Sequence, residues 1–388
     1  MSVRINGTTG VTTPNLTATT KVTTADLTNT GNYNGGQLSN RNLIINGEFD
    51  VDQRGLASST SFASGAHFVA DRWDYYTNAG AIATYSATHE ISDDAPSGFT
   101  KSLKVTCTSG GSIPATGEVI YRQNIEGYLT KRLSYGEASA KSVTLSFWIK
   151  ASVTGDYGVQ LIYEADGGAN RFYVTKYTVN SANTWEYKTI TIPPNTVDAF
   201  NHTTNDLGVQ LYWDLGEGST YSGAADSGWT STYYNGLSGG VKLMENTGAT
   251  WQKTGVQLEV GDTATPFEHR SYGEELAKCQ RYYYKRIGEQ SSGTLRHDIG
   301  ILDTSDQAIF VIQYPVVMRA VPSFSSSGTS FFTMESSNGT SVTNFLTYSA
   351  GTHLYSLGVY AAGTGTRGHA AALRSSSANA YLAFDAEL

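Results

Sequence analysis

The sequence predicts an all-β protein, in which a jelly-roll β-sandwich is followed by a smaller C-terminal β-sandwich. The first observation is composition: the 388 residues include 41 Gly and 25 Tyr, and only 15% are charged, against about 25% in an average soluble domain. The second is that apolar and polar residues alternate along many short segments, which is typical of strands with one buried face. The third is that only one short linker helix is indicated.

Residues 1–41 differ from the rest and are predicted to form an extended oligomeric stem. Eleven of them are Thr, and the string VTT at 11–13 recurs at 22–24, an approximate repeat of 11 residues. Each copy has too few apolar residues to bury a core within one chain. The segment is therefore either a flexible tail or a strand that pairs with copies from other chains, and its β-branched residues favour the second.

Residues 42–270 are predicted to form the jelly roll, because their alternation indicates strands separated by Gly, Asn and Asp turns. The apolar positions of the clearest strands are Val143, Leu145, Phe147 and Ile149; Val159, Leu161 and Tyr163; Leu207, Val209, Leu211 and Trp213; and Val256, Leu258 and Val260. The intervening positions are mostly polar, so each strand is expected to bury one face.

Residues 271–285 are predicted to be the linker helix. Ser271 and Glu274 make a Ser-x-x-Glu capping box, and Leu276, Cys279 and Tyr283 follow with helical spacing. From 286 to 388 the two-residue alternation resumes, which predicts the smaller sandwich as a tip domain. Its apolar positions include Ile299, Ile301, Ile309, Val311, Leu357, Val359, Leu382 and Phe384.

Several classes of function are disfavoured by composition. The chain has 26 basic and 34 acidic side chains and no cationic run, so nucleic-acid binding is not expected. No stretch approaches the roughly 20 apolar residues that span a bilayer, and residues 1–7 lack the apolar core of a signal peptide, so we expect synthesis in the cytoplasm without membrane insertion. Cys107 and Cys279 are expected to be buried, reduced thiols.

No pattern in the sequence singles out a catalytic site. The G-x-S-x-G and HExxH patterns do not occur, and no sequence feature singles out two of the acids as the carboxylate pair of a glycosidase. Residues 363–368 match G-x-G-x-x-G but no helix is expected after them, so we interpret them as a hairpin. Residues 50–55 begin like a calcium loop, yet Arg54 stands where an acid or amide is needed, which rejects an EF-hand.

Aromatic side chains in Gly-rich segments are the candidate ligand contacts. The first set lies within residues 213–237 and comprises Trp213, Tyr221, Trp229, Tyr233 and Tyr234. The second set lies in the last domain and comprises His353, Tyr355 and Arg367. Aromatic faces stack on the C–H faces of sugars, and Tyr among Gly and Ser also suits protein-binding loops. The alternative is that these rings pack the edge of a sandwich, and the sequence leaves both interpretations open.

A series of strings resembles a recurrent module of bacteriophage tail fibres. It comprises NLIINGEF at 42–49, QRG at 53–55, ADRW at 70–73, LSFW at 145–148, TGVQLEVG at 254–261, TPFE at 265–268 and CQRYY at 279–283. Their order and spacing match as well. The string MRA at 318–320 and Pro322 resemble the β-domain that often follows in such fibres.

The resemblance implies a jelly roll similar to carbohydrate-binding modules, carried on a homotrimeric fibre of the virion. Such proteins usually recognise a host surface and lack catalytic activity. No cofactor is required, but in related carbohydrate-binding jelly rolls two acids can hold a structural calcium. Glu48 and Glu259 occupy those positions here.

One principal hypothesis and two alternatives follow. In the principal one, the chain is a non-enzymatic tail fibre, or receptor-binding, protein. Its N-terminal residues 1–41 attach it to a phage tail or adaptor protein, and its β domains bind a host-surface polysaccharide. The first alternative is a structural virion component, such as a baseplate, head-fibre or adaptor protein, that uses the same module for protein contacts. The second is a tailspike depolymerase, although no coil repeat typical of a parallel β-helix is found after residue 41.

Overall fold

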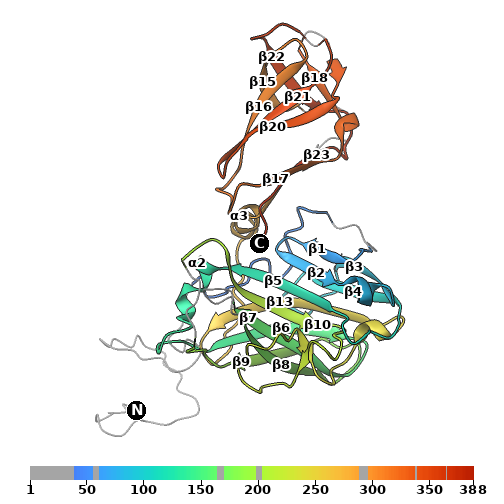
Figure 1. The fold of residues 1–388 in the computed structure, drawn as a ribbon, viewed down its shortest axis with the longest axis vertical. Helices are drawn as coiled ribbons and strands as arrows, with labels where there is room; N and C mark the ends of the chain where they lie inside the picture. Colours follow the sequence, from blue (N-terminus) through green and yellow to red (C-terminus); the bar gives the residue numbers. More distant parts are fainter. Residues whose placement is uncertain are drawn as a thin grey trace, which may run out of the picture.

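The computed structural model describes residues 39–55, 61–163, 170–197, 203–287, 296–336, 339–363 and 365–388. These residues form two β-sandwiches, a wide one below a slender one in Figure 1, so the predicted all-β fold class is confirmed. The predicted stem, apart from its last three residues, lies outside the described residues. Within the described ranges, no helix has the length and apolar character needed to cross a membrane.

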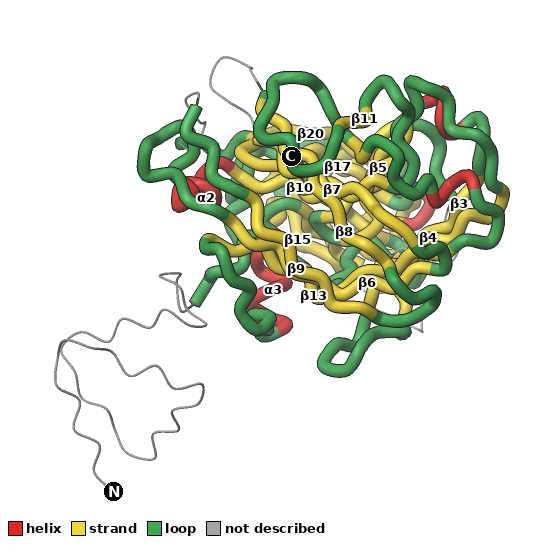
Figure 2. The backbone as a smooth tube through the Cα atoms, turned by 90° about the horizontal axis from the view of Figure 1, so that it is seen from below, coloured by secondary structure: helices red, strands yellow, loops and turns green. Residues whose placement is uncertain are grey.

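The wide sandwich consists of two antiparallel sheets packed face to face. The six-stranded sheet has the order β1 (Gly65–Ala70), β2 (Trp73–Thr77), β5 (Val119–Glu126), β10 (Leu207–Asp214), β7 (Gly155–Tyr163) and β8 (Arg171–Val179). The five-stranded sheet has the order β3 (Ser86–Ser92), β4 (Ser102–Ser109), β13 (Thr250–Val260), β6 (Val143–Ala151) and β9 (Glu186–Ile192). Figure 2 shows strands in the middle of this sandwich with loops around them.

Short elements connect these strands. They are α1 (Ala79–Ile82), α2 (Gly127–Thr130), the 3-10 turns η1 (Lys131–Leu133) and η2 (Leu243–Glu245), and a parallel pair made of β11 (Ser222–Gly223) and β12 (Gly236–Leu237). The pair β11 and β12 belongs to the long connection between β10 and β13. We call residues 215–242 of that connection the aromatic loop.

The core of the wide sandwich lies between its two sheets, as the alternation predicts. The strand residues that are 0% exposed include Val143, Leu145, Phe147, Ile149, Val159, Leu161, Tyr163, Val209, Leu211, Val256 and Leu258. They belong to strands of both sheets, so the two inner faces close on each other. The predicted apolar positions therefore face the core, but the opposite faces of β7 and β13 are buried as well, where only one buried face was expected.

Helix α3 (Tyr272–Gln280) begins as the capping box predicts, because Ser271 Oγ accepts a hydrogen bond from the Glu274 backbone N–H at 3.3 Å. The helix ends before the predicted boundary. Residues from Tyr283 onward form strand β14 (Tyr283–Ile287), which pairs with β23 (Tyr381–Asp385). This pairing satisfies their backbone groups within the second sandwich. Cys279 and Cys107 are both buried and free, as expected.

In the slender sandwich, a three-stranded sheet covers one face of a seven-stranded sheet. The smaller sheet has the order β14, β23 and β17 (Ser323–Ser326). The larger has the order β19 (Gly339–Ser341), β18 (Phe332–Glu335), β22 (Ala370–Ser375), β15 (Arg296–Leu302), β16 (Gln307–Gln313), β21 (Leu354–Tyr360) and β20 (Asn344–Ala350), with η3 (Thr329–Phe331) before β18. Its core includes Phe310, Ile312, Leu357, Leu373, Leu382 and Phe384.

The outer face of the seven-stranded sheet is apolar. Ile299, Ile301 and Val311 are 75%, 62% and 52% exposed, and Ile301 lies directly opposite Ile309 on the neighbouring strand. On β16 the core face is instead formed by Ala308, Phe310 and Ile312. The alternation of Ile309 with Val311 thus located a strand, but those two residues lie on its outer side.

The end of the chain ties the slender sandwich to the wide one, and the C-terminus lies between them in Figure 1. Arg72 makes an ion pair with Glu387, and both side chains are at least 96% buried, with exposures of 2% and 4%. Arg54 approaches the other Glu387 oxygen at 3.1 Å. Asn124 Nδ2 donates to the backbone carbonyl of Leu388 at 3.0 Å. The motif residues at 53–55 and 70–73 therefore help to build the domain junction.

Candidate functional site

Trp213, the first predicted contact residue, is not available to a ligand. It lies on β10 with 0% exposure, and its ring faces the core. The Nζ of Lys253 lies 3.5 Å from the centre of this ring and 3.8 Å from that of Trp73. Burial lowers the pKa of Lys253 well below its usual value. We therefore correct the assignment of Trp213 from a loop contact to a core residue.

The remaining rings of the first set are carried by the aromatic loop, and most of them pack on the sandwich. Trp229 is half-buried, and its Nε1 donates to the Pro193 carbonyl at 3.0 Å. Tyr234 is half-buried against Gly223, where a Cβ would come within 2.7 Å of its ring. Tyr221 meets Tyr233 edge-on, with ring centres 5.3 Å apart. Packing against the sandwich or against neighbouring rings thus accounts for Trp229, Tyr234 and Tyr221.

Tyr233 is the exposed member of this set. Its side chain is 48% exposed, and its hydroxyl donates to Glu118 Oε1 at 2.9 Å. Asn235 Nδ2 donates to the same oxygen, also at 2.9 Å. The ring also packs edge-on against Phe172 with centres 5.4 Å apart. Tyr233 remains the one ring of the aromatic loop that presents a large part of its surface to solvent.

Buried carboxylates under the aromatic loop hold it in place. Asp214 accepts hydrogen bonds from the backbone N–H groups of Gly216, Glu217 and Leu237 at 2.8, 2.9 and 2.9 Å. Burial raises the pKa of Asp214 to about 6. Burial, together with the charge of Asp214, raises the pKa of Glu217 well above its usual value. Asp214 is thus used by the backbone of the loop, whereas Glu217 Oε1 accepts from the Val119 N–H of β5 at 2.9 Å and its Oε2 is buried without a hydrogen-bond partner.

The second predicted set, in the slender sandwich, is not brought together. Tyr355 is 1% exposed and belongs to the core, which corrects its assignment. His353 is exposed and its Nδ1 lies 3.1 Å from the Thr352 hydroxyl. The Arg367 side chain is 80% exposed and pairs with Asp303 at 3.5 Å. Arg367 lines a hollow of about 620 Å³ on the apolar outer face of the sheet, so His353 and Arg367 have separate surroundings.

The two acids assigned to calcium are engaged with other groups. Glu259 Oε1 accepts from Gln257 Nε2 and from the Thr265 N–H at 2.9 and 2.8 Å, and its Oε2 accepts from the Thr265 hydroxyl at 2.7 Å. Glu48 lies 2.9 Å from His269 Nδ1. In the described part of the chain, no group of three or more His, Cys, Asp or Glu side chains could hold a metal ion. These two residues do not fit a calcium ion as they stand.

An aromatic groove lies elsewhere, on the outer side of the five-stranded sheet. It encloses about 820 Å³. Its aromatic lining residues are Phe99, Trp148, Tyr187, Phe267 and His269. The hydroxyl side chains in its walls are Ser97, Thr189, Thr263 and Thr265. We refer to this feature as the aromatic groove.

The floor of the aromatic groove is a cross-strand ring pair. Trp148 on β6 lies directly opposite Tyr187 on β9, and their ring centres are 5.4 Å apart. Phe147 and Ile149, which flank Trp148 on β6, are core residues, so the side-chain alternation sends Trp148 outward, and Tyr187 opposite it lies on the same side of the sheet. Tyr187 is 45% exposed and Trp148 is half-buried. The two rings are tilted by 49° to each other, and they form an apolar surface on the outside of the sheet.

The wall of the aromatic groove comes from two loops. Phe99 and Phe267 pack edge-on with ring centres 5.2 Å apart. Phe99 lies over Gly255, which has φ +60°, and a Cβ there would come within 2.6 Å of the Phe99 ring. Only glycine allows both this left-handed backbone and the close approach of the ring. Gly255 therefore positions one wall of the aromatic groove.

The lining of the aromatic groove carries almost no net charge. Its lining combines exposed rings and hydroxyl groups, and His269 is the lining side chain paired with a carboxylate, that of Glu48. Burial raises the pKa of Glu48, and the hydrogen bond to His269 opposes the shift. Sites that bind small molecules combine apolar walls with a few polar groups in this way. The aromatic groove suits a neutral ligand that has apolar faces and hydroxyl groups.

The sequence analysis did not identify the aromatic groove. One signal for it is visible: Trp148 occupies a position of its strand where the alternation requires an outward side chain. The loop residues Phe99 and Phe267 carry no comparable local signal.

No family model matches the chain, and no curated protein matches it. Among solved structures, it is similar to the enzymatically active domain of bacteriophage CBA120 tailspike protein 4, with 10% identity and a TM-score of 0.31. That match covers 57% of this chain and 22% of the tailspike chain, so this chain spans about a fifth of that protein.

Two further similarities concern carbohydrate-binding modules. The CBM22-1 xylan-binding domain of Paenibacillus barcinonensis Xyn10C matches with 12% identity and a TM-score of 0.28, covering 54% of this chain and 96% of that domain. The family 11 carbohydrate-binding module of Clostridium thermocellum cellulase Lic26A-Cel5E matches with 16% identity and a TM-score of 0.26, covering 54% of this chain and 100% of that module.

Proposed function

We propose that the chain is a non-enzymatic receptor-binding protein of a bacteriophage tail fibre, and that it attaches the virion to a host-surface polysaccharide. The observation that carries the binding proposal is the aromatic groove, with Trp148 and Tyr187 side by side on the outside of a rigid sheet. The series of tail-fibre strings from residue 42 to 283 supports the biological setting. No catalytic role is assigned to any residue.

A sugar ring matches the chemistry of the aromatic groove. The C–H faces of a pyranose are apolar, and stacking them on Trp148 and Tyr187 buries apolar area on both partners. The ring hydroxyls point outward from the edge of the sugar, toward side chains such as Thr189 and Thr263 in the walls. The groove volume of about 820 Å³ lies in the usual range for ligand sites. A short stretch of polysaccharide is the ligand that fits.

The proposed assembly is a homotrimer, held to a tail or adaptor protein by residues 1–41. The exposed apolar face around Ile299, Ile301 and Val311 supports an oligomer, because a monomer would leave this surface in water. Three copies on one stem also raise the effective concentration of weak sites, by about a hundredfold or more in avidity. Sedimentation of the purified full chain is expected to give three times the mass of one chain. A monomeric mass would contradict the trimer.

A structural virion component is the second candidate. The same apolar face favours it, because contacts between virion proteins would also cover those residues. In that case the purified chain would bind another virion protein tightly and host cells not at all. The tailspike depolymerase remains a third candidate, which oligosaccharide release would reveal.

The proposed function is tested by adsorption competition. Purified full-length protein is expected to reduce phage adsorption to intact host cells, and soluble host polysaccharide alone is expected to reduce it as well, because it occupies the same sites on the virion. The same incubations report on catalysis, because size-exclusion profiles of the polysaccharide should not change with time. Failure to block adsorption, or shortening of the polysaccharide, would contradict the proposal.

A further inference from the structure

The outer face of the five-stranded sheet continues past the aromatic groove. Strand β9 begins at Glu186, and Tyr187 and Thr189 on its outer side line the groove. Trp185 lies two positions before Tyr187, just ahead of the strand, and is half-buried. It is not one of the residues that line the groove. Trp185 is therefore a further ring next to the end of the groove.

Its contacts place Trp185 on the same side of the sheet as the groove. Trp185 Nε1 donates to Asp94 Oδ1 at 3.2 Å, and Asp94 Oδ2 accepts from Lys150 Nζ at 2.7 Å. Lys150 lies two positions after Trp148 on β6, so these two side chains share the outer face. Positions two apart in an extended chain are roughly 7 Å apart, which is the spacing expected between Trp185 and Tyr187.

One loop borders both the aromatic groove and Trp185. Residues 93–101 connect β3 to β4. Phe99 near the end of this loop forms a wall of the groove, and Asp94 near its start holds the Trp185 ring. Ser102 Oγ donates to the Asp94 carbonyl at 2.7 Å, which fastens the start of the loop to β4. The groove and Trp185 thus share one loop and one sheet.

Polar groups accompany Trp185 as they accompany the rings of the groove. The Lys150 and Asp94 side chains are 22% and 43% exposed and neutralise each other. The hydrogen bond from Lys150 lowers the pKa of Asp94, so the carboxylate stays ionised. An ammonium group has three donors and a carboxylate about four acceptor sites, so both groups keep hydrogen-bonding capacity beyond this pair. A ring beside such groups suits a sugar and its hydroxyls.

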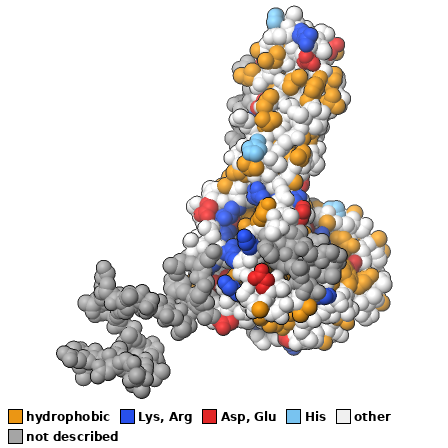
Figure 3. Space-filling model, turned by 60° about the vertical axis from the view of Figure 1, so that its left-hand side comes forward, with side chains coloured by type: hydrophobic (Ala, Val, Ile, Leu, Met, Phe, Trp, Pro, Cys, Tyr) orange, Lys and Arg blue, Asp and Glu red, His pale blue; other side chains and the backbone are white. Residues whose placement is uncertain are grey.

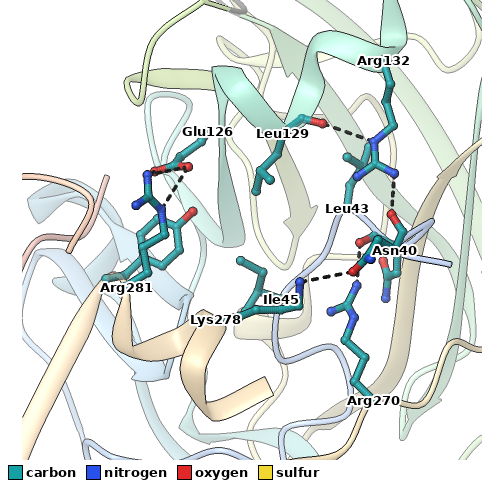
Figure 4. Close-up of a pocket in the computed structure, with 11 residues that line it drawn as sticks. Asn40, Leu43, Ile45, Glu126, Leu129, Arg132, Arg270, Lys278 and Arg281 are labelled. Atoms are coloured by element: carbon teal, nitrogen blue, oxygen red, sulfur yellow. Dashed lines mark hydrogen bonds and ion pairs between the residues drawn. The ribbon is translucent and has the colours of Figure 1, made fainter. Parts of the chain in front are cut away.

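The waist between the two sandwiches is a different kind of surface. Figure 3 shows Lys and Arg side chains gathered there. In Figure 4 Arg281 faces Glu126, and the ion pair between them measures 2.9 Å. Arg270 pairs with Glu275 at 3.1 Å. These charges are used between the chain's own elements and hold α3 against the wide sandwich. The weakly charged surface that suits a sugar chain is that of the five-stranded sheet.

We propose that Trp185 is a second stacking site for the host polysaccharide, so that one linear chain runs out of the aromatic groove along β9 and over Trp185. This inference rests on the proposed glycan-binding function, and it names the class of substrate as a linear stretch longer than the groove. One sugar stacks on Trp148 and Tyr187, and a later sugar of the same chain stacks on Trp185. Asp94 is a positioning residue, because it holds the edge of the Trp185 ring through Nε1.

The affinity then depends on the length of the bound chain. A fragment that fills only the aromatic groove contacts Trp148 and Tyr187, whereas a longer one also reaches Trp185. The longer fragment loses its translational and rotational freedom only once. The additional stacking therefore adds to its affinity, by about tenfold for one aromatic contact.

The test is a calorimetric titration of the full-length protein with size-fractionated oligosaccharides from partial hydrolysis of the host-surface polysaccharide. Trp185→Ala is expected to bind short fragments like the wild type and long fragments about tenfold more weakly. Trp185→Phe keeps a stacking ring but loses the donor to Asp94, and is expected to retain most of the gain with length. Tyr128→Ala removes a ring that is 57% exposed on α2. It is the matched control and is expected to bind like the wild type.

The outcomes separate this inference from the proposed function. Trp185→Ala that matches the wild type at every fragment length overturns the second stacking site, and so does an equal loss for short and long fragments. Trp185→Phe as weak as Trp185→Ala would assign the effect to the Asp94 hydrogen bond and overturn stacking. In each of these cases a loss of binding in Trp148→Ala leaves the glycan-binding function in place. A wild-type protein that binds no fragment of any length overturns both.

Discussion

Replacing Arg72 with alanine is expected to lower the free energy of unfolding by about 3–5 kcal/mol, because it removes one partner of a buried ion pair. The guanidinium pairs with Glu387, donates to the Asn124 carbonyl and lies 3.4 Å from the centre of the Tyr282 ring. Without it, the Glu387 carboxylate, which is 4% exposed, keeps Arg54 as its cationic partner but loses the fully buried one. Differential scanning calorimetry of the full chain measures the change.

Two further variants give this prediction its control. Lys101→Ala removes one partner of an exposed pair, in which Asp93 is 86% exposed, and is expected to change stability by less than about 1 kcal/mol. The double variant with Arg72→Met and Glu387→Met replaces the buried pair with apolar side chains, and is expected to recover much of the loss. An Arg72→Ala protein as stable as Lys101→Ala would show that the junction does not depend on this pair.

Replacing Trp148 with alanine is expected to weaken polysaccharide binding by about 30-fold or more, which corresponds to the roughly 2 kcal/mol of a binding hot spot. The ring is part of the floor of the aromatic groove, and its cross-strand neighbour Tyr187 would lose this contact as well. Trp148 is only half-buried and lies on the outer side of its sheet, so the core behind it is unchanged. Calorimetric titration with fragments of the host polysaccharide measures the affinity.

The sandwich core could be predicted from the sequence because its signal is local. The four apolar residues from Val143 to Ile149 recur every second position, and this period alone assigns them to one face of a strand. The start of α3 could be predicted for the same reason, since its signal, Ser271 and Glu274, lies within one turn. The end of α3 could not be predicted locally, because Tyr283 leaves the helix to pair with Asp385, about a hundred positions later in the chain.

Burial of aromatic residues was harder to predict. Trp213 was counted with a Gly-rich loop, yet it is the last core-facing ring of β10 and contacts Lys253. An alternating pattern does not reveal where a strand ends, so a ring at its boundary can be assigned to either environment. On β16 the opposite error occurred, because a predicted core residue proved to be exposed. Both faces of that strand are apolar, and Val311 lies on the outward face.

The aromatic groove and the domain junction depend on contacts between distant segments. Trp148 meets Tyr187 across two strands, while Phe99 and Phe267 come from loops that are far apart in the sequence. Arg72 pairs with Glu387 near the end of the chain, while its neighbour Asp71 accepts from the Gln53 backbone N–H at 2.7 Å. No short-range pattern encodes these partners.

The central claim is that the aromatic groove, rather than the aromatic loop, binds the host glycan. The most direct test compares wild-type protein, Trp148→Ala and Tyr233→Ala in one titration with the same polysaccharide fragments. Tyr233 is the matched control, because it is 48% exposed on the aromatic loop, which contacts the six-stranded sheet through Phe172. The account predicts a large loss of affinity for Trp148→Ala and near wild-type affinity for Tyr233→Ala. The opposite order, or equal affinities in all three proteins, would contradict it.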